Sequence, residues 1–526
     1  MLTNAAKTMT TQCTTGDPCP RLEKHALICS SAILIPDVTY SLTPPMANYI
    51  ILQNSISCQF TNRAGTAEAF PEPISPVLKS GPVVLNDAAP RETNARRREA
   101  FKSMTSKLAL NGGIPVVKPG DITPWPYITE DDKKAVMAVL DGNMTEQRTL
   151  QAEELKKEWA AYVGTKHCIS VSSGTSALHL CVAGLGLEPG DEVIVPAFTY
   201  WASAAAVLHH NCIPVFVDID PVTYTIEPTL IEAAITPRTR AIMTVHIHGM
   251  PCDMDPIRAI AKKRGLAIIE DGAQAQGAMY KGKRTGSLGD CAGFSLQMSK
   301  NLTTGSEGGL FVCDDDLIQK RAALLEYLGE IVVPGRERQM QEYNAYGLGW
   351  AYRPDTMGQA MVRSRIRHLD ADNAGRIANS EFLNGQFAGM KGVSPPAVVD
   401  GRQSVYYCYV LGLNPEQLGL DVDRAAFRDK FMEALGKEGV PCCMWQRMPV
   451  PAQEIFQTRT GYGKGCPWKC PYGREVDYDA NGYPETSAFI ANHVYLNQIA
   501  PPNDTTLMAK YAEAVGKVIE NAEQLV

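Results

Sequence analysis

From about residue 107 onward, apolar runs of strand length alternate with segments of helical periodicity. Seven such runs can be read along the chain: HCISVSS, EVIVPA, IPVFVDI, RAIMTVHIHG, LAIIEDG, CAGFSLQ and GGLFVCDD. Helical segments follow the first two, beginning at Thr175 and at about Trp201. Runs of Val, Ile and Ala flanked by helices are typical of a largely parallel sheet that is covered on both faces. The alternation therefore predicts an α/β fold whose ligand site lies at the carboxyl ends of the strands.

The chain of 526 residues is too long for a single hydrophobic core, so more than one folding unit is expected. Residues 1–106 are rich in Pro, Ser and Thr and show no sustained periodicity, which predicts a poorly structured N-terminal extension. We expect a large domain over residues 107–374 and a smaller α+β domain over residues 375–526. In the smaller domain, helical patterns at Asp423–Glu438 and Thr505–Gln524 flank a stretch rich in Gly, Pro and Tyr.

The composition excludes several classes of protein. A formal net charge of −7 argues against nucleic-acid binding, which needs a basic face. No apolar run reaches the roughly 18 residues of a membrane-spanning helix, and Ala26–Ile35 makes a poor signal peptide. The 15 cysteines are scattered, which is typical of reduced thiols in a cytoplasmic protein. Cys466 and Cys470 have no second Cys/His pair at zinc-site spacing, so we expect no metal.

The segment FSLQMSKNLTTGSEGGL contains Lys300, just after a predicted strand. A single lysine is usually an ordinary surface residue. Two other strand ends, however, carry complementary chemistry. LAIIEDGAQAQGA ends its strand at Glu270–Asp271, and SSGTSALHL leads from a strand into a helix through small residues.

Together these three segments predict a site for pyridoxal phosphate. A helix N-terminus with small hydroxyl side chains binds a phosphate group, a role that suits Gly174, Thr175 and Ser176. An aspartate near an aromatic nitrogen keeps that nitrogen protonated, and a lysine amine forms an imine with an aldehyde. Asp271 and Lys300 fit these two roles.

Residues 107 to about 525 resemble the DegT/StrS-type aminotransferases, which act on keto-sugars and cyclitols. The segments that carry the resemblance are LALNGGIPV, SSGTSALHL, PAFTYWAS, VDIDPVTYTI, HIHGMPCDMDPI, EDGAQAQGA and FSLQMSKNLTTGSEGG. The resemblance implies the PLP-dependent transferase fold type I, with a mostly parallel seven-stranded sheet, and it implies a homodimer.

The resemblance also assigns roles by position. Lys300 is expected to be the Schiff-base lysine and proton shuttle, and Asp271 the partner of the pyridine nitrogen. The remaining expected cofactor contacts are Gln274 on the phenolic oxygen, Tyr200 over the ring with Trp201 as its adjacent rival, and Ser295 with Thr175 and Ser176 on the phosphate.

One segment departs from the family pattern. Many relatives carry Gly-Tyr-Asn-Tyr-Arg, whose asparagine reaches the phosphate in the partner subunit, whereas this chain reads GWAYRPD with Ala351 at that place. Arg353 persists. Arg336 and Arg338, in the preceding loop, suit either a substrate carboxylate or phosphate or a solvated surface. His246 and His248 are expected to line or support the site rather than to bind metal.

These residues predict a ping-pong aminotransferase. It moves an amino group from glutamate or glutamine to a keto-sugar or keto-cyclitol through a Schiff base on Lys300. Some relatives replace this lysine with histidine and are dehydratases, so its presence favours transamination. The alternatives are another fold type I enzyme (a lyase, an aldolase, a decarboxylase or an aminobenzoate-forming synthase) and a regulator. A regulator is disfavoured because residues 1–104 show no helix-turn-helix pattern.

Overall fold

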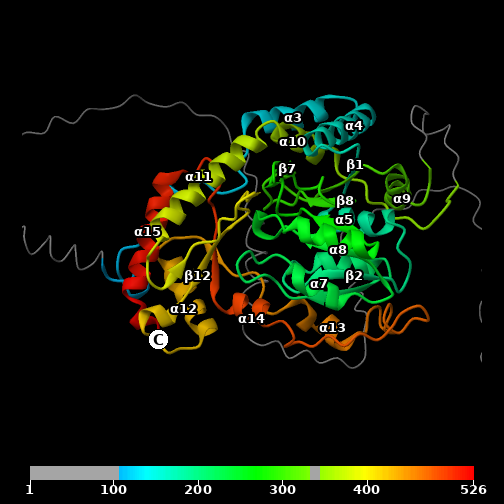
Figure 1. Cartoon of the computed structure of the whole chain (residues 1–526). Coiled ribbons are helices and arrows are strands. Elements are labelled where there is room, and N and C mark those ends of the chain that lie inside the picture. Colours follow the sequence, from blue (N-terminus) through cyan, green and yellow to red (C-terminus); the bar gives the residue numbers. More distant parts are fainter. Residues whose placement is uncertain (1–105, 332–343) are drawn as a thin grey trace, which may run out of the picture. The chain divides into compact units, whose positions relative to one another are not determined.

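The computed structural model describes residues 106–331 and 344–526. Its largest sheet has seven strands in the order β1-β9-β8-β5-β4-β2-β3, all parallel except β9. Figure 1 labels β1, β2 and β8 of this sheet. In chain order these strands are β1 His167–Val171, β2 Glu192–Pro196, β3 Ile213–Val217, β4 Thr239–Val245, β5 Ala267–Asp271, β8 Cys291–Ser295 and β9 Gly309–Cys313. All seven apolar runs of the sequence are therefore confirmed as strands of a mostly parallel sheet.

Successive side chains of the central strands enter different apolar clusters on the two faces of this sheet. Along β2, Val193 and Val195 pack with α5 (Gly174–Gly184) and α6 (Ala202–His209), whereas Ile194 packs with α7 (Pro228–Ala234) and α8 (Met254–Arg264). Because alternate residues of a strand point to opposite faces, such a sheet is buried on both sides, and its strands read as continuous apolar runs. The other helices are α3 Glu130–Asp141, α4 Met144–Val163, α9 Asp316–Glu326, α10 Thr356–Ile366, α11 Leu369–Phe387, α12 Arg424–Lys437, α13 Glu454–Thr458, α14 Pro484–Ala491 and α15 Thr505–Glu520.

A second, antiparallel sheet has four strands in the order β10-β12-β14-β13. Their bounds are β10 Val393–Ser394, β12 Tyr409–Leu413, β13 Cys442–Cys443 and β14 His493–Leu496. Its core includes side chains from α11, α12 and α15, and the last two confirm the helices expected near residues 423–438 and 505–524. A small third sheet, which the sequence did not predict, pairs β11 (Arg402–Gln403), β6 (Met279–Tyr280) and β7 (Lys283–Arg284).

The first described residues pack with the C-terminal part of the chain. Leu108 and Val117 are buried in the same apolar cluster as α12 and α15. The fully buried carboxylate of Glu438 accepts the backbone N–H of Ala109 at 2.7 Å and pairs with Lys517 at 2.9 Å.

The predicted domain boundary at residue 374 stays a prediction, and α11 runs continuously across it. The predicted extension 1–106 lies outside the described residues except for its last position. Within the described ranges, every cysteine is a free thiol, and no helix is both long and apolar enough to cross a membrane.

Candidate active site

The turn between β1 and α5 presents small polar groups at the carboxyl edge of the main sheet. Ser173 caps α5, and its hydroxyl accepts the backbone N–H of Ser176 at 3.1 Å. The Ser176 hydroxyl in turn contacts the hydroxyls of Ser172 at 3.2 Å and Ser173 at 2.9 Å. Thr175 is partly buried in the first turn of α5. This first turn has free backbone N–H groups and a favourable dipole, so it can bind an anion.

Gly174 brings this turn against the end of β8. A Cβ added at Gly174 would lie 2.6 Å from the Cβ of Ser295, closer than real side chains approach. Ser295 is the last residue of β8 and is buried. The glycine is therefore required by close packing, and the structure brings Gly174 and Ser295 together.

Asp271 ends β5 as a buried carboxyl group. Its Oδ2 accepts the hydroxyl of Ser203 at 2.7 Å, and its Oδ1 accepts the backbone N–H of Ala273 at 3.0 Å. Burial raises the pKa of Asp271 above its ordinary value, and these two donors and the nearby charge of Lys300 only partly offset the rise. A cationic partner inside the site would therefore stabilise the ionised form.

Gln274 is held in one orientation by the backbone. Its Oε1 accepts the N–H of His248 at 2.7 Å, and the side chain is buried. The orientation leaves the Gln274 amide N–H₂ group as the donor available to a ligand.

Lys300 lies in the turn that follows β8. Its backbone N–H donates to Gln297 at 2.8 Å, and its carbonyl accepts the indole N–H of Trp125 at 3.2 Å. Its Nζ lies over the ring of Tyr407, 4.6 Å from the ring centroid. Within the described ranges this amine makes no ion pair. An aromatic face attracts a cation without consuming its hydrogen bonds, so the amine stays available for chemistry.

Two residues that contact this site were missed from the sequence. Ser203 could not be recognised from the sequence, because a small residue in an alanine-rich helix usually serves only helix packing. Tyr407 comes from a segment 107 residues after Lys300, and no local pattern links the two. The Tyr407 hydroxyl also contacts Ser299 at 2.8 Å, next to the lysine.

Tyr200 is 60% exposed, and its ring lies 6.3 Å from that of Trp445. Its carbonyl oxygen lies 3.2 Å from the hydroxyl oxygen of Ser203, whose single proton is donated to Asp271. Its rival Trp201 packs partly buried against the main core, which leaves Tyr200 as the accessible ring. The ring-facing role of Tyr200 stays a prediction.

The two histidines of the HIHG segment have protein partners. His246 accepts the backbone N–H of Cys252 at its Nδ1 and pairs through Nε2 with buried Glu270 at 3.0 Å. His248 contacts the hydroxyl of Tyr495 at 3.0 Å. In the described ranges, no group of three or more His, Cys, Asp or Glu residues is placed to hold a metal ion.

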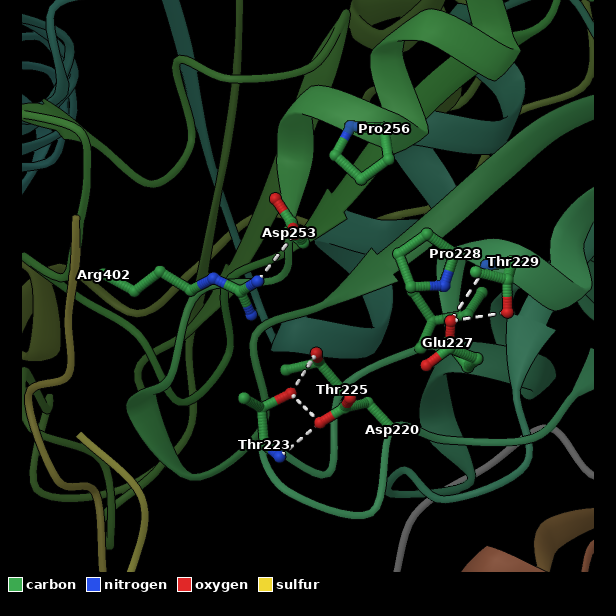
Figure 2. Close-up of a pocket in the computed structure, with 10 residues that line it drawn as sticks. Asp220, Thr223, Thr225, Glu227, Pro228, Thr229, Asp253, Pro256 and Arg402 are labelled. Atoms are coloured by element: carbon green, nitrogen blue, oxygen red, sulfur yellow. Dashed lines mark hydrogen bonds and ion pairs between the residues drawn. The ribbon is translucent and has the colours of Figure 1, made fainter. Parts of the chain in front are cut away.

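Figure 2 shows a different pocket, lined by residues of the loop after β3, the start of α8 and Arg402. Its volume is about 190 Å³. Its polar side chains satisfy one another: Arg402 pairs with Asp253 at 2.8 Å, and Glu227 accepts the Thr229 hydroxyl at 2.7 Å. Because these lining groups are already paired, we assign the pocket no ligand.

The GWAYR segment lies against the anion-binding turn of its own chain. The carbonyl of Tyr352 accepts the backbone N–H of Ser172 at 2.7 Å, and Ala351 bridges to Tyr327. Arg353 lies over the ring of Tyr327. Arg336 and Arg338 lie outside the described residues.

The residues present fit pyridoxal phosphate. The first turn of α5 offers free backbone N–H groups and small polar side chains to a phosphate, and Gly174 lets this turn pack against Ser295. The buried Asp271 carboxyl lacks a cationic partner in direct contact, and the Lys300 amine is free of ion pairs among the described residues. These strand ends, of β1, β5 and β8, all lie at one edge of the sheet.

Comparison with known proteins agrees with this geometry. A model of the DegT/DnrJ/EryC1/StrS aminotransferase family matches residues 126–469. An L-glutamine:2-deoxy-scyllo-inosose aminotransferase of Streptomyces paromomycinus is 35% identical over 371 residues, covering 68% of this chain and 85% of that protein. A pleiotropic regulatory protein of Geobacillus stearothermophilus is 35% identical over 341 residues, covering 64% and 86%.

Among solved structures, the chain is similar to DesV of S. venezuelae, crystallised in complex with a ketimine intermediate. The TM-score is 0.62 at 31% sequence identity, and the match covers 74% of this chain and 94% of DesV. On the family match, the relatives and the fold, this chain belongs to the DegT/DnrJ/EryC1/StrS aminotransferase family, whose enzymes depend on pyridoxal phosphate and have fold type I.

Proposed function

We propose that the chain catalyses a ping-pong transamination from glutamate or glutamine to a keto-sugar or keto-cyclitol. The observation that carries the proposal is the placement of three complementary groups at one edge of the main sheet. These are the amine of Lys300, the buried carboxyl of Asp271 and the anion-binding turn at Gly174. A single one of these groups does not indicate a cofactor site. The three together match the aldehyde, the ring nitrogen and the phosphate of one cofactor.

Bound pyridoxal phosphate supplies an aldehyde carbon for the amino group and a ring that withdraws electrons from the substrate Cα. The Asp271 carboxylate holds the proton on the ring nitrogen, with Ser203 and Ala273 fixing its two oxygens. Lys300 Nζ, once free, takes a proton from the substrate Cα as a general base and then delivers it as a general acid.

Other side chains orient the cofactor. The first turn of α5, with Thr175, Ser176 and Ser295, binds the phosphate. The Gln274 amide donates to the phenolic oxygen, since its own carbonyl oxygen is occupied by His248. Tyr200 lies over the ring face.

The amino donor and the acceptor are proposed from the names of the relatives. The similar Streptomyces paromomycinus enzyme is named for glutamine and an inosose, which supports glutamine or glutamate as donor and a cyclitol or sugar ketone as acceptor.

We also propose a homodimer in the cytoplasm. Leu348 is 93% exposed, with Tyr346 and Trp350 half-exposed beside it in sequence. A second copy would remove this apolar surface from water. The free thiols of the described residues are in keeping with a reducing compartment.

The test is a half-reaction screen on the purified holoenzyme. Candidate amino donors are added, and loss of the visible absorption of the lysine-bound cofactor is followed together with release of the oxo-acid. When a ketone acceptor is then added, transamination must yield oxo-acid and aminated product in equal amounts. A lyase, aldolase, decarboxylase or aminobenzoate-forming synthase would break that equality.

Lys300→Ala should abolish turnover, and Lys300→Arg serves as the matched cationic control, because it keeps a charge but cannot form the imine. Turnover by either variant, or a wild-type protein that binds no pyridoxal phosphate, would remove the proposal.

A further inference from the structure

A row of hydrogen-bonded side chains leads from the core to the GWAYR segment. The Tyr352 hydroxyl lies 3.0 Å from Nδ1 of His179, a buried residue of α5. Nε2 of His179 lies 3.2 Å from Nδ1 of His210, and Nε2 of His210 lies 3.1 Å from the carbonyl oxygen of Leu187. We call these three side chains, Tyr352, His179 and His210, the histidine relay.

The hydrogen bond from His210 to the Leu187 carbonyl determines which atom donates in each of the other hydrogen bonds of the relay. A carbonyl oxygen only accepts, so Nε2 of His210 carries the hydrogen donated to Leu187. Burial lowers the pKa of His210 and lowers that of His179 to about 3, so both rings are neutral at physiological pH. Nδ1 of His210 therefore accepts from His179, and Nδ1 of His179 accepts from the hydroxyl of Tyr352.

The outer end of the relay reaches the anion-binding turn. Tyr352 accepts the backbone N–H of Ser172 at 2.7 Å through its own carbonyl. The Ser172 hydroxyl contacts that of Ser176 at the start of α5, while His179 lies further along the same helix. Tyr352 is thus bonded through its backbone to the strand end before the helix and through its side chain to the helix itself.

The ring of Tyr352 is restrained in a second way. Trp350 stacks on it with an interplanar angle of 7° and a centroid distance of 6.1 Å. The hydroxyl bonded to His179 and the offset Trp350 ring both limit the rotation of this side chain. Ala351, between the two aromatics, contributes no polar group to this arrangement.

We propose that the histidine relay is a positioning device for the phosphate-binding turn. By fixing Tyr352, His179 and His210 hold the Ser172 backbone and so keep the N–H groups of α5 aimed at the anion. The inference rests on the proposed function, because it takes the anion to be the phosphate of the cofactor. His179 and His210 act through Tyr352 and touch no reacting atom.

The experiment uses three probes on apoprotein prepared from the purified enzyme. Pyridoxal phosphate tests the whole site, pyridoxal tests the site without its phosphate, and inorganic phosphate, as a competitor, tests the turn alone. His210→Leu and Tyr352→Phe each break the relay, and His210→Gln keeps an acceptor and a donor in similar positions. His209→Leu is the matched control, since His209 adjoins His210 but is exposed and makes no hydrogen bond in the relay.

For His210→Leu and Tyr352→Phe, we expect binding of pyridoxal phosphate and of phosphate to weaken by about tenfold, the usual worth of one buried hydrogen bond. Binding of pyridoxal should not change, and His210→Gln should recover most of the loss. His209→Leu should bind all three probes as the wild type does.

Two results would overturn the inference. One is unchanged phosphate affinity in Tyr352→Phe, which removes one oxygen atom and leaves the ring stack in place. The other is an equal loss for pyridoxal and pyridoxal phosphate, which would mark a general effect on the fold. Failure of the wild-type protein to bind pyridoxal phosphate would instead remove the proposed function, so the two failures are distinguishable.

Discussion

Replacing Ser203 by alanine tests the electrostatics of the site directly. The Ser203 hydroxyl donates to Oδ2 of Asp271 at 2.7 Å, and both side chains are buried. A hydrogen bond to a charged group contributes about 1.5–3 kcal/mol, and both partners here are buried. If Asp271 holds the proton of the ring nitrogen, we expect kcat/KM of the half-reaction to fall by about ten- to a hundredfold.

The variant also changes the pH dependence in a defined direction. Burial already raises the pKa of Asp271, and the Ser203 hydroxyl lowers it. Loss of the hydroxyl therefore raises this pKa further, so Asp271 becomes protonated at higher pH. The acid limb of the kcat/KM profile should move to higher pH.

The assay is the rate of the half-reaction with the best amino donor across the pH range. Thr199→Val is the matched control, because Thr199 contacts the Ser203 hydroxyl at 2.7 Å but not Asp271. An acid limb that stays in place in Ser203→Ala, or that moves equally in the control, would refute the reasoning.

Three further predictions concern neighbouring residues. Asp271→Asn should abolish turnover but raise the thermal stability of the apoprotein at neutral pH. Because the pKa of Asp271 is raised in the folded state, the wild type loses stability as the pH rises through that pKa. The variant lacks this carboxyl group, so its melting temperature should not show this pH dependence. Tyr407→Leu should lower the rate at which Lys300 reacts with added pyridoxal phosphate by a few-fold, because leucine has no aromatic face to hold the amine in place. Tyr407→Phe keeps that face and should react at a rate close to the wild type, as followed by stopped-flow absorbance. Gly174→Ala should weaken cofactor binding at equilibrium by about tenfold or more, since its Cβ meets Ser295, and adding Ser295→Gly should restore part of the loss.

The main sheet could be predicted because each buried strand is encoded locally. The runs at residues 192–196 and 267–271 are buried on both faces and mostly apolar, so their neighbours in sequence suffice to identify them. The antiparallel direction of β9 was not predicted, since a buried strand reads the same in either direction. The two-residue strands of the third sheet gave no periodic signal at all.

The candidate site was predictable only where function leaves a local motif. Lys300, Asp271 and Gly174 each lie in a distinctive segment at a strand end. Tyr407 does not, because its place over the lysine depends on how a distant segment packs. His210 likewise looks like one of two helix-end histidines, and only the fold separates it from exposed His209.

The buried carboxylate of Glu438 sets a limit on how far the chain can be trimmed. Removing the chain up to and including Ala109 would take away one backbone donor of this carboxylate, at 2.7 Å, and removal past Val116 would take away the second, at 3.2 Å, leaving Lys517 as its counterion. A shortened chain should therefore begin upstream of Leu108, so that Leu108 stays in the apolar cluster of α12 and α15 and Ala109 stays bonded to Glu438.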